Sequence, residues 1–242
     1  YYEGRHYIFY EEVIYQRNKE EGQICVMEIN LQGEVVENKQ ILKKTYHLSS
    51  PTVFEYEGSY YMIPESSANS TIELYRAVNF PYEWEFVKNI MENVKAVDTT
   101  FFQKDGKCWL FTGLKRLPGT SSSEELFLYY SDSLLADHWT SHPMNPVVSD
   151  VRSARPAGKL FYHNNRLYRP SQDCSAHYGY SLMVNEVDQF TETEYKEHVS
   201  TCIRPEWEKD VMGTHTLNND HNLFVIDALI TRRKHWLKFS RS

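Results

Sequence analysis

A pattern of strand, turn and strand recurs along the chain, and it constrains the fold more than any other feature. The clearest copy covers residues 46–67, YHLSSPTVFEYEGSYYMIPESS, where two runs rich in aromatic and β-branched residues flank a Glu-Gly turn. Four further copies occur at residues 1–12, 99–111, 158–170 and, more weakly, 216–228. The chain is therefore predicted to consist of repeated β-hairpins.

The spacing of these hairpins indicates a β-propeller. Their turns are marked by Gly4, Gly58, Gly106, Asn165 and His221, which lie 54, 48, 59 and 56 residues apart. A propeller blade of four antiparallel strands uses about 40 to 50 residues and stacks radially on its neighbours. We therefore expect an all-β, five-bladed β-propeller of four-stranded antiparallel blades, in which residues 1–242 form a single domain.

The two ends of the chain indicate that this propeller belongs to something longer. Residue 1 is Tyr rather than Met and lies close to the end of a strand, so the first strand of the first blade is expected upstream. The basic segment TRRKHWLKFSRS, residues 231–242, is predicted to be an exposed edge strand or a lead into another domain rather than a membrane or partner patch. Its KHWLKFS portion is a candidate for one more strand of the fifth blade.

Composition excludes several classes of partner. The net charge of −7 and the pI near 5.8 argue against nucleic acid, which requires a basic face. No apolar run has the length of a bilayer span, so no transmembrane segment is expected. The four cysteines are scattered without a CxxC pair, which indicates free thiols in a reducing compartment and hence a cytoplasmic protein.

Motifs for cofactors and metals are missing from the sequence. It contains no HExxH, P-loop, GxSxG or dinucleotide-binding motif. No cluster of His and Cys has the spacing of a metal site. We therefore expect neither a cofactor nor a metal ion.

The ends of the inner strands are the predicted position of a functional site, because they surround the central channel of a propeller and converge there from distant blades. Counted from the turn markers, matching positions are occupied by Glu11, Glu65, Gly113 and Gln172, with Glu12 and Asp173 one residue further on. Counted backwards, Ser50 matches Asp98, while Arg155 and His215 lie in the approaches to the fourth and fifth hairpins. These residues predict a funnel-shaped site on the axis.

Two carboxylates are the candidates for acid-base chemistry. Asp98 lies between the apolar pairs Ala96-Val97 and Phe101-Phe102, where an unpaired charge would be costly, so it is expected to be either partnered or functional. Glu65 follows a strand-breaking Pro64, and its alternative is a solvated carboxylate at the rim or one that accepts hydrogen bonds from backbone amides.

Six further residues are predicted to bind a ligand: His47, Arg155, Arg169, Asp173, His215 and Glu12. Arg155 suits a bidentate contact to an anion or sugar, and its alternative is an ion pair with Asp150 or an axial carboxylate. The two histidines suit hydroxyl binding or proton transfer, and their alternative is a structural hydrogen bond.

The segments SSPTVFEYEGSYYMIPES, AVDTTFFQKDGKCWLF, ARPAGKLF and RPSQD resemble a known family. They are similar to the five-bladed propeller domain at the front of glucosamine inositolphosphorylceramide transferases, over about residues 1–227. That domain is in turn similar to the propellers of glycoside hydrolase family 43. The resemblance implies a carbohydrate ligand and a fused catalytic domain elsewhere in a longer protein.

Family 43 enzymes use a carboxylate base in the first blade, an orienting Asp in the third and a Glu acid in the fourth. By this resemblance, Asp98 matches the orienting Asp, and the base would precede Tyr1. The fourth-blade Glu-Gly-Pro reads Ala154-Arg155-Pro156 here, so the acid is missing from its usual place, and Glu65 is the candidate substitute.

Three functions are therefore open. The first is a glycan-binding propeller that holds a sugar-containing ligand in its axial funnel as part of a larger glycan-processing protein. The second is a family 43-like glycoside hydrolase in which Asp98 and Glu65 share the acid-base work. The third is a structural propeller that binds another protein.

Overall fold

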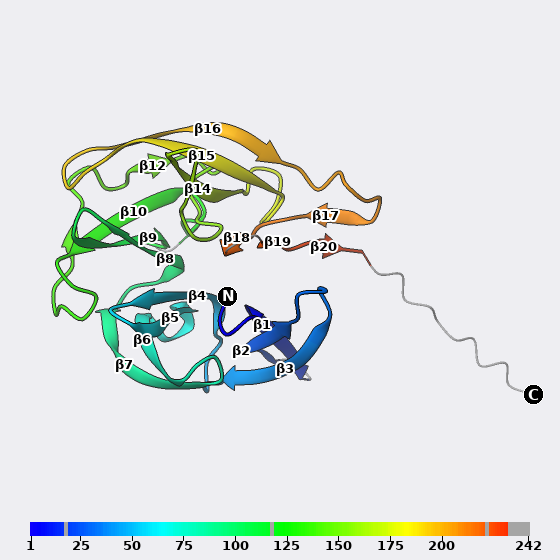
Figure 1. Ribbon diagram of the computed structural model, residues 1–242. Coiled ribbons are helices and arrows are strands. Elements are labelled where there is room, and N and C mark those ends of the chain that lie inside the picture. The colour runs from blue at the N-terminus through cyan, green and yellow to red at the C-terminus, as the bar shows by residue number, and fades with distance from the viewer. Residues whose placement is uncertain (17–18, 117–118, 221–222, 232–242) are drawn as a thin grey trace, which may run out of the picture.

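The computed structural model describes residues 1–16, 19–116, 119–220 and 223–231. In these ranges the chain is made of β-strands, loops and one short 3₁₀ helix, Ser67–Asn69. The sheets follow one another around a common centre, towards which the inner strands face (Figure 1). No helix within these ranges is both long and apolar enough to cross a bilayer.

Four antiparallel sheets make up most of the ring. The first is β1 (His6–Gln16), β2 (Lys19–Ile29) and β3 (Val35–Leu42). The second is β4 (Ser49–Tyr56), β5 (Ser59–Ser66), β6 (Thr71–Asn79) and β7 (Glu83–Glu92). The third is β8 (Ala96–Lys104), β9 (Lys107–Leu114), β10 (Glu125–Ser131), β11 (Thr140–Ser141) and β12 (Val148–Ser149). The fourth is β13 (Phe161–His163), β14 (Arg166–Asp173), β15 (Ser181–Phe190) and β16 (Tyr195–Ile203).

The C-terminal part forms two short ladders instead of a further blade. In one, β17 (Val211–Gly213) pairs with β20 (Leu229–Ile230), and in the other, β18 (Leu217–Asp220) pairs with β19 (Leu223–Ile226). The predicted all-β propeller is confirmed, but the prediction of five four-stranded blades is wrong. The described residues form four sheets of three to five strands.

The spacing of the turns predicted the wrong number of blades, because it does not show whether the segments after each turn pair into a sheet. In the described residues after β16, the strands are two to four residues long and pair only two by two, so neither ladder gains a third strand. The fifth turn marker, His221, and the proposed KHWLKFS strand lie outside the described residues.

The other four turns are confirmed in detail. Each marker and the residue before it have positive φ: 48° and 82° at Glu3-Gly4, 48° and 74° at Glu57-Gly58, 51° and 74° at Asp105-Gly106, and 49° and 62° at Asn164-Asn165. Two successive left-handed residues are the signature of a tight hairpin turn whose twist matches that of the strands. Gly, Asn and Asp tolerate this conformation best, which is why these positions could be found in the sequence.

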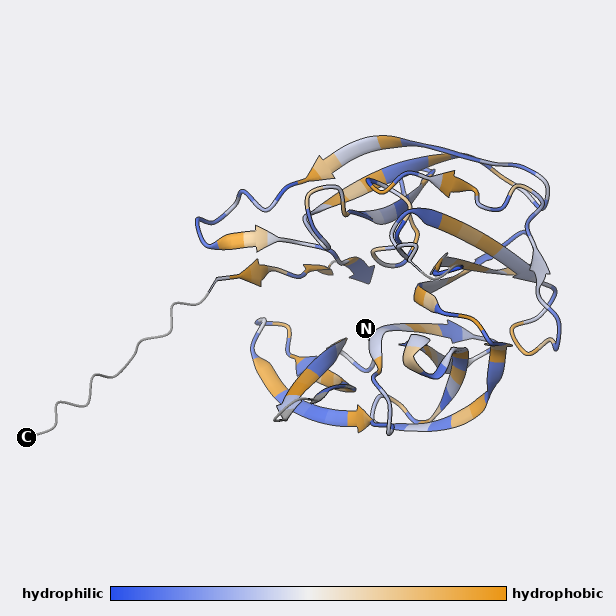
Figure 2. Cartoon of the chain, turned by 180° about the vertical axis from the view of Figure 1, so that it is seen from behind, coloured by the Kyte–Doolittle hydropathy of each residue, from blue (hydrophilic) through white to orange (hydrophobic). Residues whose placement is uncertain are grey.

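The core lies between neighbouring sheets. Phe54 of the second sheet stacks on Phe101 of the third at 4.0 Å between ring centroids, and Trp109 of the third meets Phe190 of the fourth at 4.5 Å. Hydrophobic and hydrophilic residues alternate along the strands (Figure 2). Each sheet therefore buries its faces against its neighbours and leaves the ends of its inner strands at the centre.

Candidate functional site

Asp98 is positioned by a break in the ladder at the start of the third sheet. The register of β8 against β9 shifts between Val97 and Thr100, and Asp98 has a φ of 48°. Ser50 has the same conformation, with a φ of 41°, at a register shift in the second sheet. Positive φ is unfavourable for a non-glycine residue and is often retained where a bulge redirects a side chain. The bulge therefore removes Asp98 from the regular alternation of the strand.

Arg155 and Gln172 hold the Asp98 carboxylate. Arg155 Nε donates to Asp98 Oδ2 at 2.6 Å, and Gln172 Nε2 donates to the same oxygen at 3.1 Å. Arg155 lies in the segment before β13, where its carbonyl accepts the Gln172 amide at 2.9 Å. Asp98, Arg155 and Gln172 are exposed by only 8%, 9% and 1%. Arg155 thus pairs with an axial carboxylate, whereas Asp150 pairs with Arg152.

Glu65 stands beside this pair at the end of β5. Its Oε2 accepts the backbone amide of Asp98 at 3.1 Å. Burial and the negative charge of Asp98 raise the pKa of Glu65 to about 7, although Arg155 opposes the shift. Glu65 is therefore present in both protonation states near neutral pH.

His47 and Glu11 form a second pair. The Gly22 amide donates to His47 Nδ1 at 3.1 Å, so the ring proton lies on Nε2, which is 2.7 Å from Glu11 Oε1. Burial raises the pKa of Glu11, although His47 opposes the shift. Gly22 permits this packing, because a Cβ atom there would lie 2.4 Å from the Leu48 carbonyl oxygen.

His215 and Asp227 form a third pair. Asp227 Oδ2 contacts His215 Nδ1, and its Oδ1 accepts the amides of His215 and Thr216 at 2.7 Å each. Burial opposes ionisation of Asp227, but hydrogen bonds and attraction from His215 lower its pKa to about 2. Burial also opposes protonation of His215, yet Asp227 outweighs this effect and raises the pKa of His215.

These groups lie close enough to influence one another. The charges of Asp98 and His215 act on Glu11, those of Asp98 and Arg155 act on His215, and that of Glu11 acts on Glu65. Tyr178 joins them, because its ring centroid is 4.7 Å from Arg155 Cζ and 5.2 Å from the His215 ring. We call this group the axial cup; its members are Glu11, His47, Glu65, Asp98, Arg155, Gln172, Tyr178, His215 and Asp227.

The structure thus brings together five of the eight predicted site residues: Glu65, Asp98, Arg155, His47 and His215. Glu12 was also predicted to bind the ligand. It directly follows Glu11 on β1, and successive side chains of a strand point to opposite faces. Glu12 lies on the other face from Glu11, where its Oε2 accepts Gln23 Nε2 at 2.7 Å and Cys25 Sγ at 3.5 Å.

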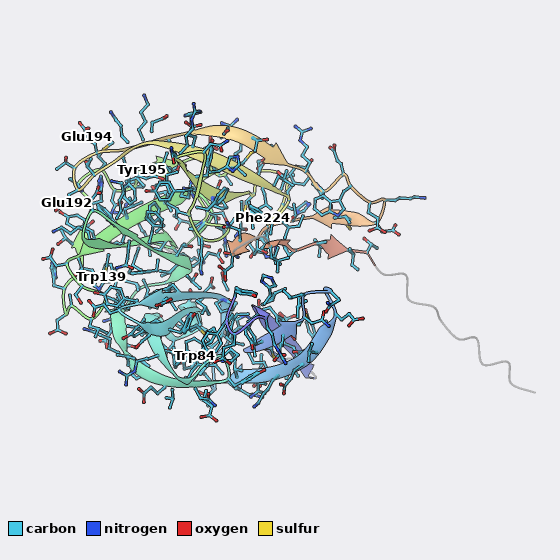
Figure 3. The ribbon with its side chains drawn as sticks, viewed as in Figure 1. Trp84, Trp139, Glu192, Glu194, Tyr195 and Phe224 are labelled. Carbon is cyan, nitrogen blue, oxygen red and sulfur yellow. The ribbon has the colours of Figure 1, made fainter. Side chains whose placement is uncertain are left out.

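Arg169 and Asp173 make their contacts inside the fourth sheet and its loop. Arg169 is 1% exposed, donates to Glu197 Oε1 at 2.5 Å and to the Ser153 carbonyl at 2.6 Å, and lies in the same network as Tyr195. Tyr195 lies in the body of the molecule, while Glu192 and Glu194 point outward from the nearby turn (Figure 3). Asp173 Oδ1 accepts the Ser175 amide at 2.9 Å and so closes the loop after β14.

Four cup members were absent from the predicted set of site residues. The match of the hairpins places Glu11 and Gln172 at the axial funnel, since they occupy the same positions after their turns as Glu65, although neither was among the residues predicted to act on or bind a ligand. Tyr178 and Asp227 lie outside the strands that define the repeat, between β14 and β15 and between β19 and β20. No periodicity in the sequence marks them.

Two hollows lie at the opposite, turn-bearing ends of the strands. One, of about 420 Å³, is lined by residues that include Lys104, Tyr162, Arg166 and Glu186. The other, of about 380 Å³, includes Lys107 and Asp132. Their charged groups are paired with each other at the surface, since Arg166 contacts Glu186 at 3.1 Å and Lys107 contacts Asp132 at 2.6 Å. The convergence of buried charged groups therefore occurs at the axial cup and not at these hollows.

The fold is a β-propeller of the kind that glycoside hydrolases adopt. Sucrose-6-phosphate hydrolase from Lactobacillus gasseri superimposes with a TM-score of 0.66 and 14% identity, over 90% of this chain and 49% of that one. A mutant of the GH43 protein BlXynB from Bacillus licheniformis gives 0.61 and 16%, over 84% and 43%. Bombyx mori GH32 β-fructofuranosidase gives 0.63 and 13%, over 94% and 53%. At these identities the likeness shows the fold alone.

The chain belongs to the family of the N-terminal domain of glucosamine inositolphosphorylceramide transferase 1, whose model matches residues 2–237. The transferase of that name from Oryza sativa subsp. japonica is 39% identical over 158 residues, which cover 64% of this chain and 21% of the relative. The one from Arabidopsis thaliana is 35% identical over 183 residues, covering 70% and 24%. The chain thus spans about a fifth to a quarter of the length of these curated relatives.

Proposed function

We propose that this chain is a glycan-recognition module of a larger carbohydrate-active protein and that it holds a sugar-containing ligand in the axial cup. The observation that carries the proposal is the meeting of Glu11, Glu65, Asp98, Arg155 and His215 from five separate segments. Carboxylates, imidazoles and a guanidinium offer both donors and acceptors to the hydroxyl groups of a sugar.

Recognition is favoured over hydrolysis by the way Asp98 is used. Its Oδ2 already accepts two hydrogen bonds, from Arg155 and Gln172, and the guanidinium balances its charge. Arg155 also stands where the resemblance to family 43 would place the catalytic acid. The cup therefore contains an internal ion pair where a hydrolase of that type needs a proton donor.

Membership of this family supports a role in recognition beside a separate catalytic domain. The relatives are named glucosamine inositolphosphorylceramide transferases, and this chain matches the model of their N-terminal domain. We infer that glycosyl transfer takes place in a part of the longer protein outside this chain. The propeller would then bind and present a glycan to that part.

A family 43-like glycoside hydrolase is the second candidate, and Glu65 is the observation that favours it. A carboxyl group with a pKa of about 7 suits a general acid, because it keeps its proton near neutral pH. Glu11 or Asp98 would then provide the second carboxylate. Glu65 makes no ion pair among those formed by the described residues, in contrast to Glu11 and Asp98.

One experiment separates these functions. The purified chain is incubated with a panel of aryl xylosides, arabinofuranosides, fructosides and glucosaminides, and both turnover and binding are measured. If the chain is a recognition module, it binds a sugar without turnover, and this binding weakens in Glu65→Gln and Asp98→Asn. Turnover that is lost in both variants would establish the hydrolase, and a chain that neither binds nor cleaves any of these sugars would favour a propeller that binds protein.

A further inference from the structure

Tyr178 contacts two basic residues of the axial cup and is also exposed to solvent. Its ring lies over the Arg155 guanidinium, with 4.7 Å between Cζ and the ring centroid, and it meets the His215 ring at an interplanar angle of 64°. Despite these contacts the residue is 53% exposed. Tyr178 therefore touches two of the three charged pairs of the cup and still presents much of its ring to solvent.

The loop that carries Tyr178 is packed tightly against the C-terminal part of the chain. Gly179 has a φ of 68°, and a Cβ atom there would lie 3.0 Å from the His215 Cβ. A Cβ atom on Gly213 would lie 2.4 Å from the Gly179 carbonyl oxygen. Two glycines thus allow β17 and this loop to approach closely. The position of the ring is set in advance, which lowers the entropy that a ligand must overcome on binding.

The surroundings of the ring combine apolar and polar chemistry. Burial and the negative charges of Asp98 and Glu65 raise the pKa of Tyr178, although Arg155 opposes the shift. Ligand pockets commonly combine an aromatic wall with a few fixed polar groups. A pyranose or furanose ring has the matching surface, because its C–H groups form an apolar face and its hydroxyls form a polar edge.

Resting on the proposed function, we infer that the exposed part of the Tyr178 ring is the platform on which a sugar ring of the ligand stacks, above the Arg155–Asp98 pair. The aromatic ring binds the apolar face of the sugar. Glu65 and His215, beside the platform, then receive its hydroxyls. Tyr178 would in this way make the axial cup selective for a cyclic sugar over a small anion.

The test uses four variants of the chain. Tyr178→Phe keeps the ring, Tyr178→Leu keeps apolar bulk without the ring, and Tyr178→Ala removes both. Tyr162→Ala is the matched control, because Tyr162 is a tyrosine with similar exposure, 60%, beside the hollow at the other end of the strands. The probes are methyl β-xyloside, methyl α-arabinofuranoside, methyl β-fructofuranoside and methyl β-glucosaminide. Their binding is measured by saturation-transfer NMR and calorimetry. Thermal melting verifies that each variant is folded.

For the sugar that the wild type binds, Tyr178→Leu and Tyr178→Ala are expected to raise Kd by about fivefold to tenfold, while Tyr178→Phe and Tyr162→Ala stay within about twofold. If the Leu and Ala variants bind as the wild type does, the platform is refuted although the glycan-recognition function stands. If the folded wild type binds none of the four probes, both the platform and the proposed recognition of these sugars are refuted.

Discussion

Two buried ion pairs in this molecule have the same chemistry and different surroundings. Arg169 and Glu197 lie within the fourth sheet, where the other contacts of the guanidinium and of the carboxylate are to the Ser153 carbonyl and the Tyr195 hydroxyl. Arg155 and Asp98 join the third and fourth sheets at the axis, where Glu65, Tyr178 and His215 surround them. The comparison shows that burial of an arginine with a carboxylate does not by itself mark a functional site. What distinguishes the axial pair is the presence of a further carboxyl group and an imidazole, those of Glu65 and His215, and the strained backbone at Asp98.

Breaking the internal pair should give the largest effect on stability. Arg169→Met leaves Glu197 as an uncompensated buried charge, so we expect the free energy of unfolding to fall by about 3–5 kcal/mol. Urea denaturation followed by tryptophan fluorescence measures this. Sugar binding by the folded fraction should not change. A loss below about 1 kcal/mol would show that the pair is not the structural support we describe.

Breaking the axial pair should affect binding more than stability. In Arg155→Met, the buried Asp98 carboxylate keeps the hydrogen bond from Gln172, so we expect a loss of about 1–3 kcal/mol in unfolding free energy. Because the guanidinium also supports Tyr178, glycan affinity should fall by at least about tenfold. Calorimetry and urea denaturation are run on the same samples. Equal stability losses in Arg155→Met and Arg169→Met, with unchanged binding, would remove the distinction between the two pairs.

Glu65, which makes no ion pair among the described residues, should make the stability of the protein depend on pH. The Arg169–Glu197 pair should not. The pKa of Glu65 is raised from 4.5 to about 7 in the folded state, so between these values the folded protein holds a proton that the unfolded chain has lost. Stability should therefore fall as pH rises from 5 to 7.5, by on the order of 2 kcal/mol for this group. The measurement is the difference between wild type and Glu65→Gln in urea midpoints across this range. A difference that is constant with pH would contradict the raised pKa.

The smallest expected effect on glycan binding is the difference between substitutions at Glu11 and Glu12, two adjacent residues of β1. Glu11 lies in the cup against His47, whereas Glu12 lies on the opposite face against Gln23. We expect Glu11→Gln to weaken glycan binding by about threefold to tenfold and Glu12→Gln to leave it unchanged. Both variants should fold with similar melting temperatures. An effect of Glu12→Gln equal to that of Glu11→Gln would mean that the strand faces the cup with the other register.

The sequence predicts the propeller well because tight turns demand particular residues. The pairs Glu57-Gly58 and Asp105-Gly106 adopt the left-handed conformations that their composition favours, and the inner strands follow from them. The number of blades does not follow from the spacing, because pairing of the outer strands depends on lengths and contacts that a residue count does not contain. After β16 the described strands pair only two by two.

The convergence of the cup residues follows from the sequence repeat for the inner strands and less well for the loops. Glu65 and Asp98 were predicted because their positions relative to the turns match those of other hairpins, and the structure brings them together. Arg155 and Arg169 both precede a proline, and the sequence does not show that one reaches the axis while the other pairs within its own sheet. Tyr178 and Asp227 enter the cup from loops, where only the tertiary fold determines direction.

The most direct test of the account is a crystal structure of the chain soaked with the glycoside that binds it best. We predict that the sugar lies in the axial cup, with its hydroxyls within hydrogen-bond distance of Glu65 and its ring against Tyr178. A sugar bound instead beside Tyr162 and Arg166, with the axial cup unchanged, would contradict the claim that the distant sheets assemble one ligand site.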